Sequence, residues 1–153
     1  MALMFLGTHV KRTDAKSRVS VPAAFRRQLE AAGDQRIVLV RSLTEPCITA
    51  YPMAQWEDRV AHISSLPQSH RAVALVKKLQ FACAAEVMPD GHGRILLPAA
   101  LRAHAGILPS TEVAAVGQGG TFDFYEVERW RLTDAAAVAA LADMAGDLAE
   151  LGL

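Results

Sequence analysis

Short segments in which apolar and polar residues alternate fill most of the chain, and they occur twice in the same order. In the first copy the pattern predicts strand, turn, strand, short helix and hairpin, with the regular elements at residues 5–13, 18–21, 22–32, 36–41 and 46–51. In the second copy the helix and the hairpin recur at residues 98–105, 112–116 and 121–127. Each helix begins at a proline and ends before a glycine, Gly33 or Gly106, as helix termini favour. The pattern therefore predicts a duplicated, β-rich α+β chain.

The duplication is clearest in one segment. Asp14-Ala15-Lys16-Ser17-Arg18-Val19-Ser20-Val21-Pro22 returns as Asp90-Gly91-His92-Gly93-Arg94-Ile95-Leu96-Leu97-Pro98. Farther along, Tyr51 and Trp56 are spaced as Tyr125 and Trp130 are. A half of about 45 residues cannot bury enough apolar surface alone, so we expect the two halves to interlock into one body with pseudo-two-fold symmetry.

The remaining segments are helical in pattern. Residues 53–65 and 68–81 predict two helices interrupted at Pro67, packed on the body. Residues 135–153 are rich in alanine. Their larger apolar residues recur at steps of three and four, so we expect them to pack against a partner surface: Leu141, Met144, Leu148 and Leu151. The predicted organisation is a first repeat, connecting helices, a second repeat and an acidic C-terminal helix, over residues 1–52, 53–82, 83–131 and 132–153.

Charge is segregated along the chain although its formal net charge is zero. Residues 1–28 carry six lysines and arginines against Asp14 alone, whereas residues 132–153 carry four acidic residues and no basic one. A local patch sets the potential that a polyanion meets, so neutrality does not exclude DNA. No apolar run is long enough to cross a membrane and no signal peptide is apparent, so we expect a cytoplasmic protein. Cys47 and Cys83 are interpreted as reduced packing residues rather than a disulfide.

The strongest candidates for chemistry are Arg18 and Arg94, each at the tip of a predicted turn. A guanidinium can donate two hydrogen bonds to O6 and N7 of guanine, and a two-stranded ribbon fits the major groove. Lys11, Arg12 and Lys16 would then contact phosphates. The alternative is that each arginine forms a local ion pair, with Asp14 or Asp90, that closes its turn. Both interpretations stay open here, because a fixed arginine can do both.

His92 stands where the first copy has Lys16, so we expect the first tip to bind DNA more strongly. A pH-sensing role for His92 is the alternative to an ordinary exposed histidine. The other histidines and the cysteines lack metal-ligand spacing, and no catalytic motif occurs. Residues 117–120 are interpreted as a hairpin turn rather than a phosphate loop, and Tyr51, Trp56, Tyr125 and Trp130 as packing residues rather than base-stacking platforms. We expect no enzyme activity, small-molecule substrate, cofactor or metal.

On the paired Asp-x-x-x-Arg segments, Met4-Phe5-Leu6-Gly7, Tyr51-Pro52 and Ala84-Ala85-Glu86, the chain resembles the MraZ family over roughly residues 4–131. The resemblance implies two AbrB-like swapped-hairpin halves that form a pseudo-dimeric β-barrel with flanking helices. It also implies a repressor of the bacterial division and cell-wall gene cluster, a nucleoid-associated homo-oligomeric ring on repeated boxes of double-stranded promoter DNA. Its DNA-contacting set corresponds to Asp14, Lys16 and Arg18, with Asp90 and Arg94 as second-copy equivalents.

Two positions depart from the family pattern. Ser17 stands where glycine is usual, which predicts a strained or differently shaped first tip, and His92 stands where Lys or Gln is usual. Two other classes of function compete with the regulator. Net neutrality and the apolar tail would also suit a protein-interaction scaffold, whereas an enzyme would need a nucleophile and a base that the sequence does not supply.

Overall fold

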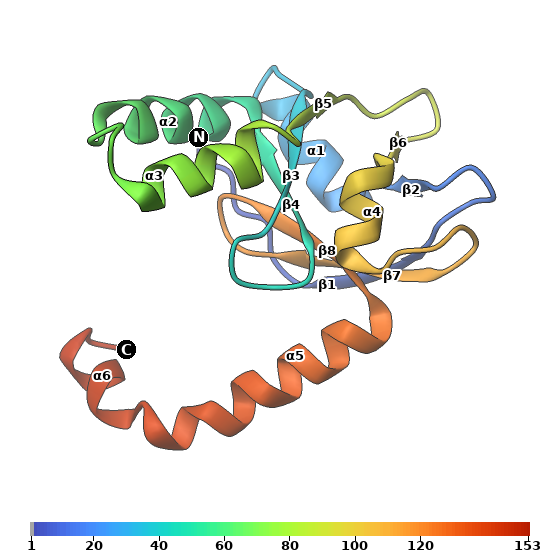
Figure 1. Cartoon of the computed structure of the whole chain (residues 1–153). Coiled ribbons are helices and arrows are strands. Elements are labelled where there is room, and N and C mark those ends of the chain that lie inside the picture. Colours follow the sequence, from blue (N-terminus) through green and yellow to red (C-terminus); the bar gives the residue numbers. More distant parts are fainter. Residues whose placement is uncertain (1) are drawn as a thin grey trace.

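The structure is a computed structural model that describes residues 2–153 (Figure 1). Eight strands carry the architecture: β1 (Thr8–Arg12), β2 (Arg18–Ser20), β3 (Ile37–Arg41), β4 (Ile48–Pro52), β5 (Ala85–Val87), β6 (Arg94–Leu96), β7 (Glu112–Gly117) and β8 (Phe122–Glu126). The helices of the two repeats are α1 (Ala23–Ala31) and α4 (Ala99–Ala105). The expected α+β class and the duplicated order of elements are confirmed.

The two copies share one antiparallel sheet. Six strands follow the order β1-β7-β8-β4-β3-β5, while β2 and β6 form a separate two-stranded ribbon. The first strand of each copy pairs with the hairpin of the other: β1 runs beside β7, from Thr8 opposite Val116 to Arg12 opposite Glu112, and β5 runs beside β3. Neither half could complete its strand pairing alone, so the halves interlock as expected.

The expectation of a closed β-barrel is wrong, because β1 and β5 are the outer strands of an open sheet and do not pair with each other. Closure would require β2 and β6 to bridge these edges. Both are three residues long and are soon followed by a proline, Pro22 or Pro98. Proline lacks the N–H that a continuing ladder needs, so the short strands pair only with each other.

The core lies between the ribbon, helices α1 and α4, and the sheet. Val19 and Ile95 point inward from the ribbon and are almost fully buried. Phe25 of α1, Phe5 and Phe122 contact one another, with ring centroids 4.9 to 5.1 Å apart. Burying each such side chain contributes about 1.5–3 kcal/mol, so this cluster, to which both copies contribute, fixes the pseudo-symmetric arrangement.

The connecting segment forms α2 (Met53–Ser65), α3 (Arg71–Val76) and a π-helical turn, η1 (Lys77–Phe81). The second helix starts three residues later than expected, at Arg71, and is capped by His70, whose side chain accepts a hydrogen bond from the N–H of Ala72. Trp56 packs between Tyr51 and Phe81, with centroids 5.5 and 5.6 Å away. This contact holds the helices to the body, as predicted.

The second aromatic pair, Tyr125 and Trp130, has its ring centroids 5.2 Å apart. The packing interpretation of the four repeated aromatic residues is therefore confirmed. Cys47 and Cys83 are both free thiols, and Cys47 is buried beside Tyr125. The expectation that they are reduced packing residues agrees with this arrangement.

The C-terminal segment differs from the single helix expected over residues 135–153. Helix α5 (Val127–Ala140) follows β8 directly because both carboxylate oxygens of Glu126 accept backbone N–H groups of its first turn, from Glu128 and Arg129. A 3-10 turn, η2 (Leu141–Asp143), then redirects the chain into α6 (Ala145–Glu150). We call residues 127–153 the arm. It runs away from the sheet (Figure 1), and every residue from Asp134 to Asp147 is exposed.

Candidate nucleic-acid interface

The first tip is a tight turn closed by the side chain and backbone of one aspartate. Asp14 Oδ1 accepts the N–H groups of Lys16 and Arg18, both at 2.9 Å. The carbonyl of Asp14 accepts the N–H of Ser17 at 3.0 Å, and its own N–H donates to the carbonyl of Arg18 at 2.9 Å. The turn is therefore held at both ends and presents Lys16 at its apex.

The second tip repeats this pattern atom for atom. Asp90 Oδ1 accepts the N–H groups of His92 and Arg94 at 2.8 and 3.0 Å. Gly93 donates to the Asp90 carbonyl at 2.9 Å, and Asp90 donates to the Arg94 carbonyl at 2.8 Å. Two segments far apart in sequence thus adopt the same turn, as their shared residues predicted.

Ser17 does not reshape the first tip. Its φ is 62° and that of Gly93 is 76°, so both residues occupy the left-handed region. Side chains other than glycine adopt this region at a cost, because Cβ approaches the following carbonyl oxygen. The expected change of shape is absent from the turn geometry, and the expected strain is confirmed by the backbone angle.

Each aspartate also orients the side chain of its arginine. Arg18 Nε donates to Asp14 Oδ2 at 2.7 Å, and Arg94 Nε donates to Asp90 Oδ2 at 3.3 Å. These bonds lower the pKa of both carboxyls, for which the largest cause is the backbone N–H of the same arginine. Arg94 Nη1 lies 3.6 Å from Asp14 Oδ2, so the two tips form one cluster of alternating charge.

The ribbon places both arginines on one outward face. Arg18 lies opposite Leu96, and Ser20 lies opposite Arg94. These four side chains alternate with the buried Val19 and Ile95, so they all point to the side away from the core. Diagonal neighbours of this kind lie roughly 7–8 Å apart. The tips therefore share a single surface rather than forming two separate ones. We call the outward face of β2 and β6, together with the two tips, the ribbon face.

Two arginines that were not expected at this surface support the tips. Arg26 Nε donates to the Val21 carbonyl at 3.0 Å, and Arg102 Nε donates to the Leu97 carbonyl at 2.8 Å. The guanidinium of Arg26 covers Gly93, where an added Cβ would lie 2.3 Å from Nη1. The repeat itself was the available signal, because Arg26 and Arg102 occupy equivalent positions in it.

The first tip has an anchor that the second lacks. Thr13 is buried, and its hydroxyl donates to the carbonyl of Leu108 at 2.8 Å while accepting the N–H of Thr111 at 2.9 Å. The N–H of Ser110 also donates to the Asp14 carbonyl at 3.2 Å. The second copy has Pro89 in place of Thr13 and cannot form these side-chain bonds. The first tip is thus tied to a loop of the opposite copy.

The remaining predicted contact residues lie at the apices of the two tips and on β1, which leads into the first tip. Lys16 is exposed at its apex, and Arg12 is exposed at the end of β1 beside it. Lys11 is half-buried on the same strand, opposite Val113. His92 is exposed at the apex of the second tip. The predicted set is therefore brought together around one ribbon, with its basic residues concentrated at the first tip.

A buried carboxyl lies in the sheet apart from the ribbon face. Asp123 of β8 is 9% exposed and is the register partner of Thr49. Burial raises its pKa to about 6, and the nearby Glu45 adds to this shift. Burial also raises the pKa of the neighbouring Cys47 thiol to about 12, so this cysteine is an unreactive thiol at neutral pH.

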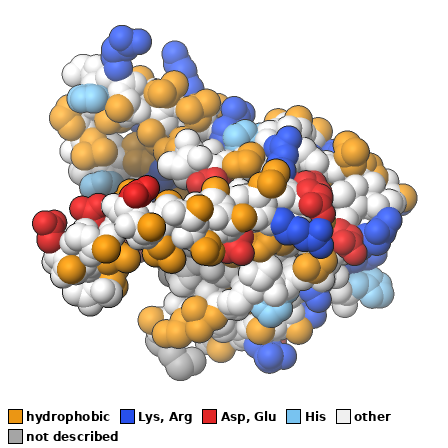
Figure 2. Space-filling model, turned by 90° about the horizontal axis from the view of Figure 1, so that it is seen from below, with side chains coloured by type: hydrophobic (Ala, Val, Ile, Leu, Met, Phe, Trp, Pro, Cys, Tyr) orange, Lys and Arg blue, Asp and Glu red, His pale blue; other side chains and the backbone are white. Residues whose placement is uncertain are grey.

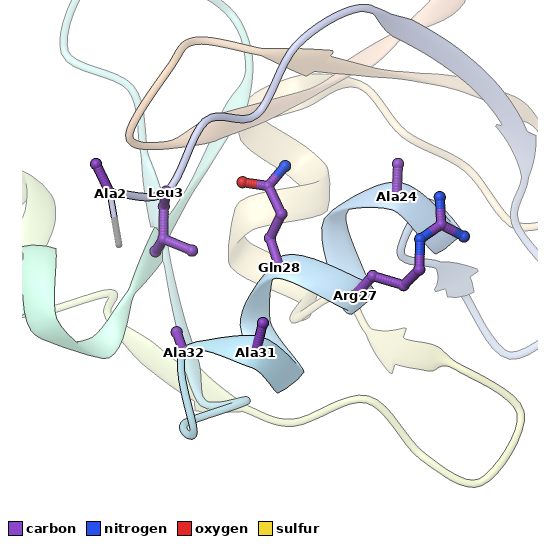
Figure 3. A pocket seen from close by; sticks show the side chains of 7 residues that line it. All are labelled: Ala2, Leu3, Ala24, Arg27, Gln28, Ala31 and Ala32. Carbon is purple, nitrogen blue, oxygen red and sulfur yellow. The ribbon is translucent and has the colours of Figure 1, made fainter.

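A hollow of about 530 Å³ between the N-terminal segment and α1 is lined mainly by alanines, with Leu3, Arg27 and Gln28 (Figure 3). Gln28 is engaged there by the backbone of Met4, at 2.6 and 2.7 Å. Within residues 2–153, no three His, Cys, Asp or Glu side chains gather as metal ligands. None of the helices in this range combines the length and hydropathy of a membrane span.

The structure is thus a duplicated α+β body with two matched arginine turns on one ribbon. The family model described as "MraZ protein, putative antitoxin-like" matches residues 4–79 and again 80–144. The chain belongs to the MraZ family, and its similar relatives are named as transcriptional regulators.

One such relative is "Transcriptional regulator MraZ" of Nitrosococcus oceani, 35% identical over 127 residues, which cover 83% of this chain and 84% of the relative. The protein of the same name from Hydrogenovibrio crunogenus is 33% identical over 99% of both chains. That from Azotobacter vinelandii is 30% identical over 95% of this chain and 94% of its own. The two longer matches extend into the arm.

Proposed function

We propose that the chain is a sequence-specific, DNA-binding transcriptional regulator that reads promoter DNA with its ribbon face. The proposal rests on how the side chain of Arg18 is held. Its Nε is bound to Asp14, while within residues 2–153 neither of its terminal amino groups donates a hydrogen bond. The carboxylate thus fixes the plane of the guanidinium and leaves its outer edge able to donate to O6 and N7 of guanine.

The two interpretations of the tip arginines support each other in this geometry. Arg18 and Asp14 do form the local ion pair. Their side chains are 34% and 31% exposed, so the pair alone contributes little to stability. Its contribution to binding is larger, because an arginine that is already oriented loses less rotamer freedom when it contacts a base. The ion pair therefore prepares the reading residue.

The surrounding charges suit phosphate contact. Lys11, Arg12 and Lys16 lie around the first tip, whereas His92 is the matching apex residue of the second. Phosphate contacts position a protein on the duplex without reading sequence. The first tip is also the anchored one, through Thr13. We infer that it supplies more of the affinity than the second.

Leu96 adds an apolar contact to the same face. It is 53% exposed and lies directly opposite Arg18. The methyl group of thymine is the feature of the major groove that an apolar side chain recognises. A ribbon with arginine and leucine side by side is therefore suited to a guanine followed by or preceded by a thymine.

The finer parts of the proposal follow from family membership. The pairing of β1 with β7 and of β5 with β3 supports the AbrB-like swapped-hairpin interpretation of the two halves. By the same resemblance, the targets are repeated boxes upstream of the division and cell-wall gene cluster, which the protein represses as a nucleoid-associated ring in the cytoplasm. Several ribbon faces on one assembly would gain affinity on repeated boxes through effective concentration.

The test is a comparison of Arg18→Ala and Arg94→Ala on DNA from upstream of the protein's own gene and on scrambled DNA. Removing a bidentate contact should cost about 1–3 kcal/mol on the native DNA and little on the scrambled DNA. Glu30→Ala, an exposed change on α1 away from the ribbon face, is the control. Unchanged discrimination in both arginine variants would refute the proposal.

A further inference from the structure

The arm exposes an apolar and acidic surface that nothing in residues 2–153 covers. Leu132, Leu141 and Leu151 are 72%, 54% and 73% exposed. The residues from 132 onward carry four acidic side chains and no basic one: Asp134, Asp143, Asp147 and Glu150. Viewed from below, hydrophobic side chains follow the arm with acidic ones among them (Figure 2). Helix α5 is about 21 Å long and leads this surface away from the body.

The helical pair α2 and α3 offers the complementary features. One hollow between them, of about 240 Å³, is lined by Ile63, Leu66, Val73 and Val76, together with Arg59, whose guanidinium donates to Gln80 Oε1. A neighbouring hollow of about 620 Å³ is lined by Arg71, Leu75 and Lys78, among smaller residues. Leu75 is 56% exposed. We call these two adjoining hollows the groove.

The charges of the two surfaces are opposite. Residues 59–82, which include all the lining residues of the groove and follow Glu57 and Asp58 of α2, carry four basic side chains and no acidic one: Arg59, Arg71, Lys77 and Lys78. Residues 132–153 of the arm carry four acidic side chains and no basic one. An amphipathic helix that lays apolar residues into a groove is a common recognition mode, and a complementary rim fixes its register and partner. We propose that the acidic arm of one copy docks in the groove of a second copy of this chain.

The occupant is a second copy rather than the arm of the same chain. Leu75 of the groove and Leu141 and Leu151 of the arm all remain exposed within one chain, so the two surfaces do not cover each other there. Arm and groove are also different surfaces. A contact between two different surfaces is head-to-tail, and it generates a ring when the rotation closes. The inference thus deepens the ring assembly under the proposed function by naming its contacts.

The test uses two variants that each lack one half of the contact. The first ends after Thr133 and keeps the groove. The second carries Leu75→Asp, which places a carboxylate in the groove, and keeps the arm. Leu108→Asp is the matched control, because Leu108 is 66% exposed and lies on the body outside both surfaces. Masses are measured by light scattering after size exclusion, with circular dichroism and thermal melting to confirm folding.

Each variant alone should lose the assembly and run as a single chain, while the control should keep the parent mass. A one-to-one mixture of the two variants should give a complex of two chains, since one supplies the arm and the other the groove. Parent mass for the truncated chain would overturn the proposal, and so would two separate single chains in the mixture. If Leu75→Asp does not fold, Lys78→Glu takes its place in the same mixture.

Binding to DNA with a single box is measured on the truncated chain as well. The ribbon face is intact in this variant, so discrimination from scrambled DNA should remain. If the truncated chain keeps both the parent mass and its discrimination of native from scrambled DNA, only the docking proposal is refuted. If the truncated chain loses the assembly but the parent chain does not distinguish native from scrambled DNA, only the DNA-binding proposal is refuted. The two failures are therefore distinguishable.

Discussion

The matched positions Ser17 and Gly93 offer a stability test of the duplicated turn. Both have positive φ, at 62° and 76°. Replacing Ser17 by glycine relieves left-handed strain of about 1–2 kcal/mol. The greater freedom of glycine in the unfolded chain offsets roughly 0.5–1 kcal/mol of that gain. Ser17→Gly should therefore stabilise the protein by about 0.5–1 kcal/mol.

The reciprocal change, Gly93→Ser, should have the opposite sign and a larger size. It introduces the same strain and also displaces Arg26, whose Nη1 would lie 2.3 Å from the new Cβ. Loss of the Arg26 bond to the Val21 carbonyl adds about 0.5–1.5 kcal/mol. The expected destabilisation is thus about 1–2.5 kcal/mol.

Urea unfolding of both variants and the parent at one protein concentration measures these changes, with calorimetry as a second readout. At this chain length, a change of 1 kcal/mol moves the melting temperature by roughly 2–4 °C. Ala15→Gly, an exposed position in the same turn without positive φ, is the control. A Ser17→Gly protein less stable than the parent, or a neutral Gly93→Ser, would refute the account of the tips.

Three further changes test other parts of the structure. Asp123 has a pKa near 3.8 when unfolded and about 6 when folded, so it should raise the free energy of unfolding as pH falls from about 7 to 4, by at most about 3 kcal/mol. Thermal melts across this pH range should show the rise in the parent protein and not in Asp123→Asn. The same pH profile in both proteins would contradict the prediction. Thr13→Val should lower the free energy of unfolding in urea by about 2–3 kcal/mol, because the N–H of Thr111 and the carbonyl of Leu108 lose their hydroxyl partner. An unchanged free energy of unfolding would mean that this anchor does not stabilise the fold. Lys11→Ala should weaken native and scrambled DNA alike and lower the salt slope by about one, whereas a selective loss on native DNA would assign it to base reading.

Most of the fold could be predicted because its signals are local and repeated. The Asp-x-x-x-Arg turns, the proline starts of both helices and the apolar alternation of the strands all depend on neighbouring residues. Their duplication also predicted that the halves interlock. Closure of the sheet could not be predicted in this way, because it depends on whether β2 and β6 bridge its edges. Two prolines and a length of three residues decided against closure.

In the candidate site, too, the local features could be predicted and the long-range ones could not. Arg18, Arg94 and their aspartates were found from spacing within a turn. That both arginines face one side of a single ribbon depends on the pairing of Arg18 with Leu96, which joins residues 78 apart in sequence. The contact of Arg26 with Gly93 likewise crosses between the copies. Long-range register of this kind leaves no periodic trace in a sequence, although the repeated position of Arg26 was a usable signal.

The most direct test of the central claim is fluorescence anisotropy of the protein on DNA from upstream of its own gene and on a scrambled control, at two salt concentrations, with Arg18→Ala alongside. We predict tight, salt-dependent binding to the native DNA and a loss of discrimination in the variant. Equal weak binding of the parent protein to both DNAs, or full discrimination by Arg18→Ala, would contradict the assignment of the ribbon face as the surface that reads DNA.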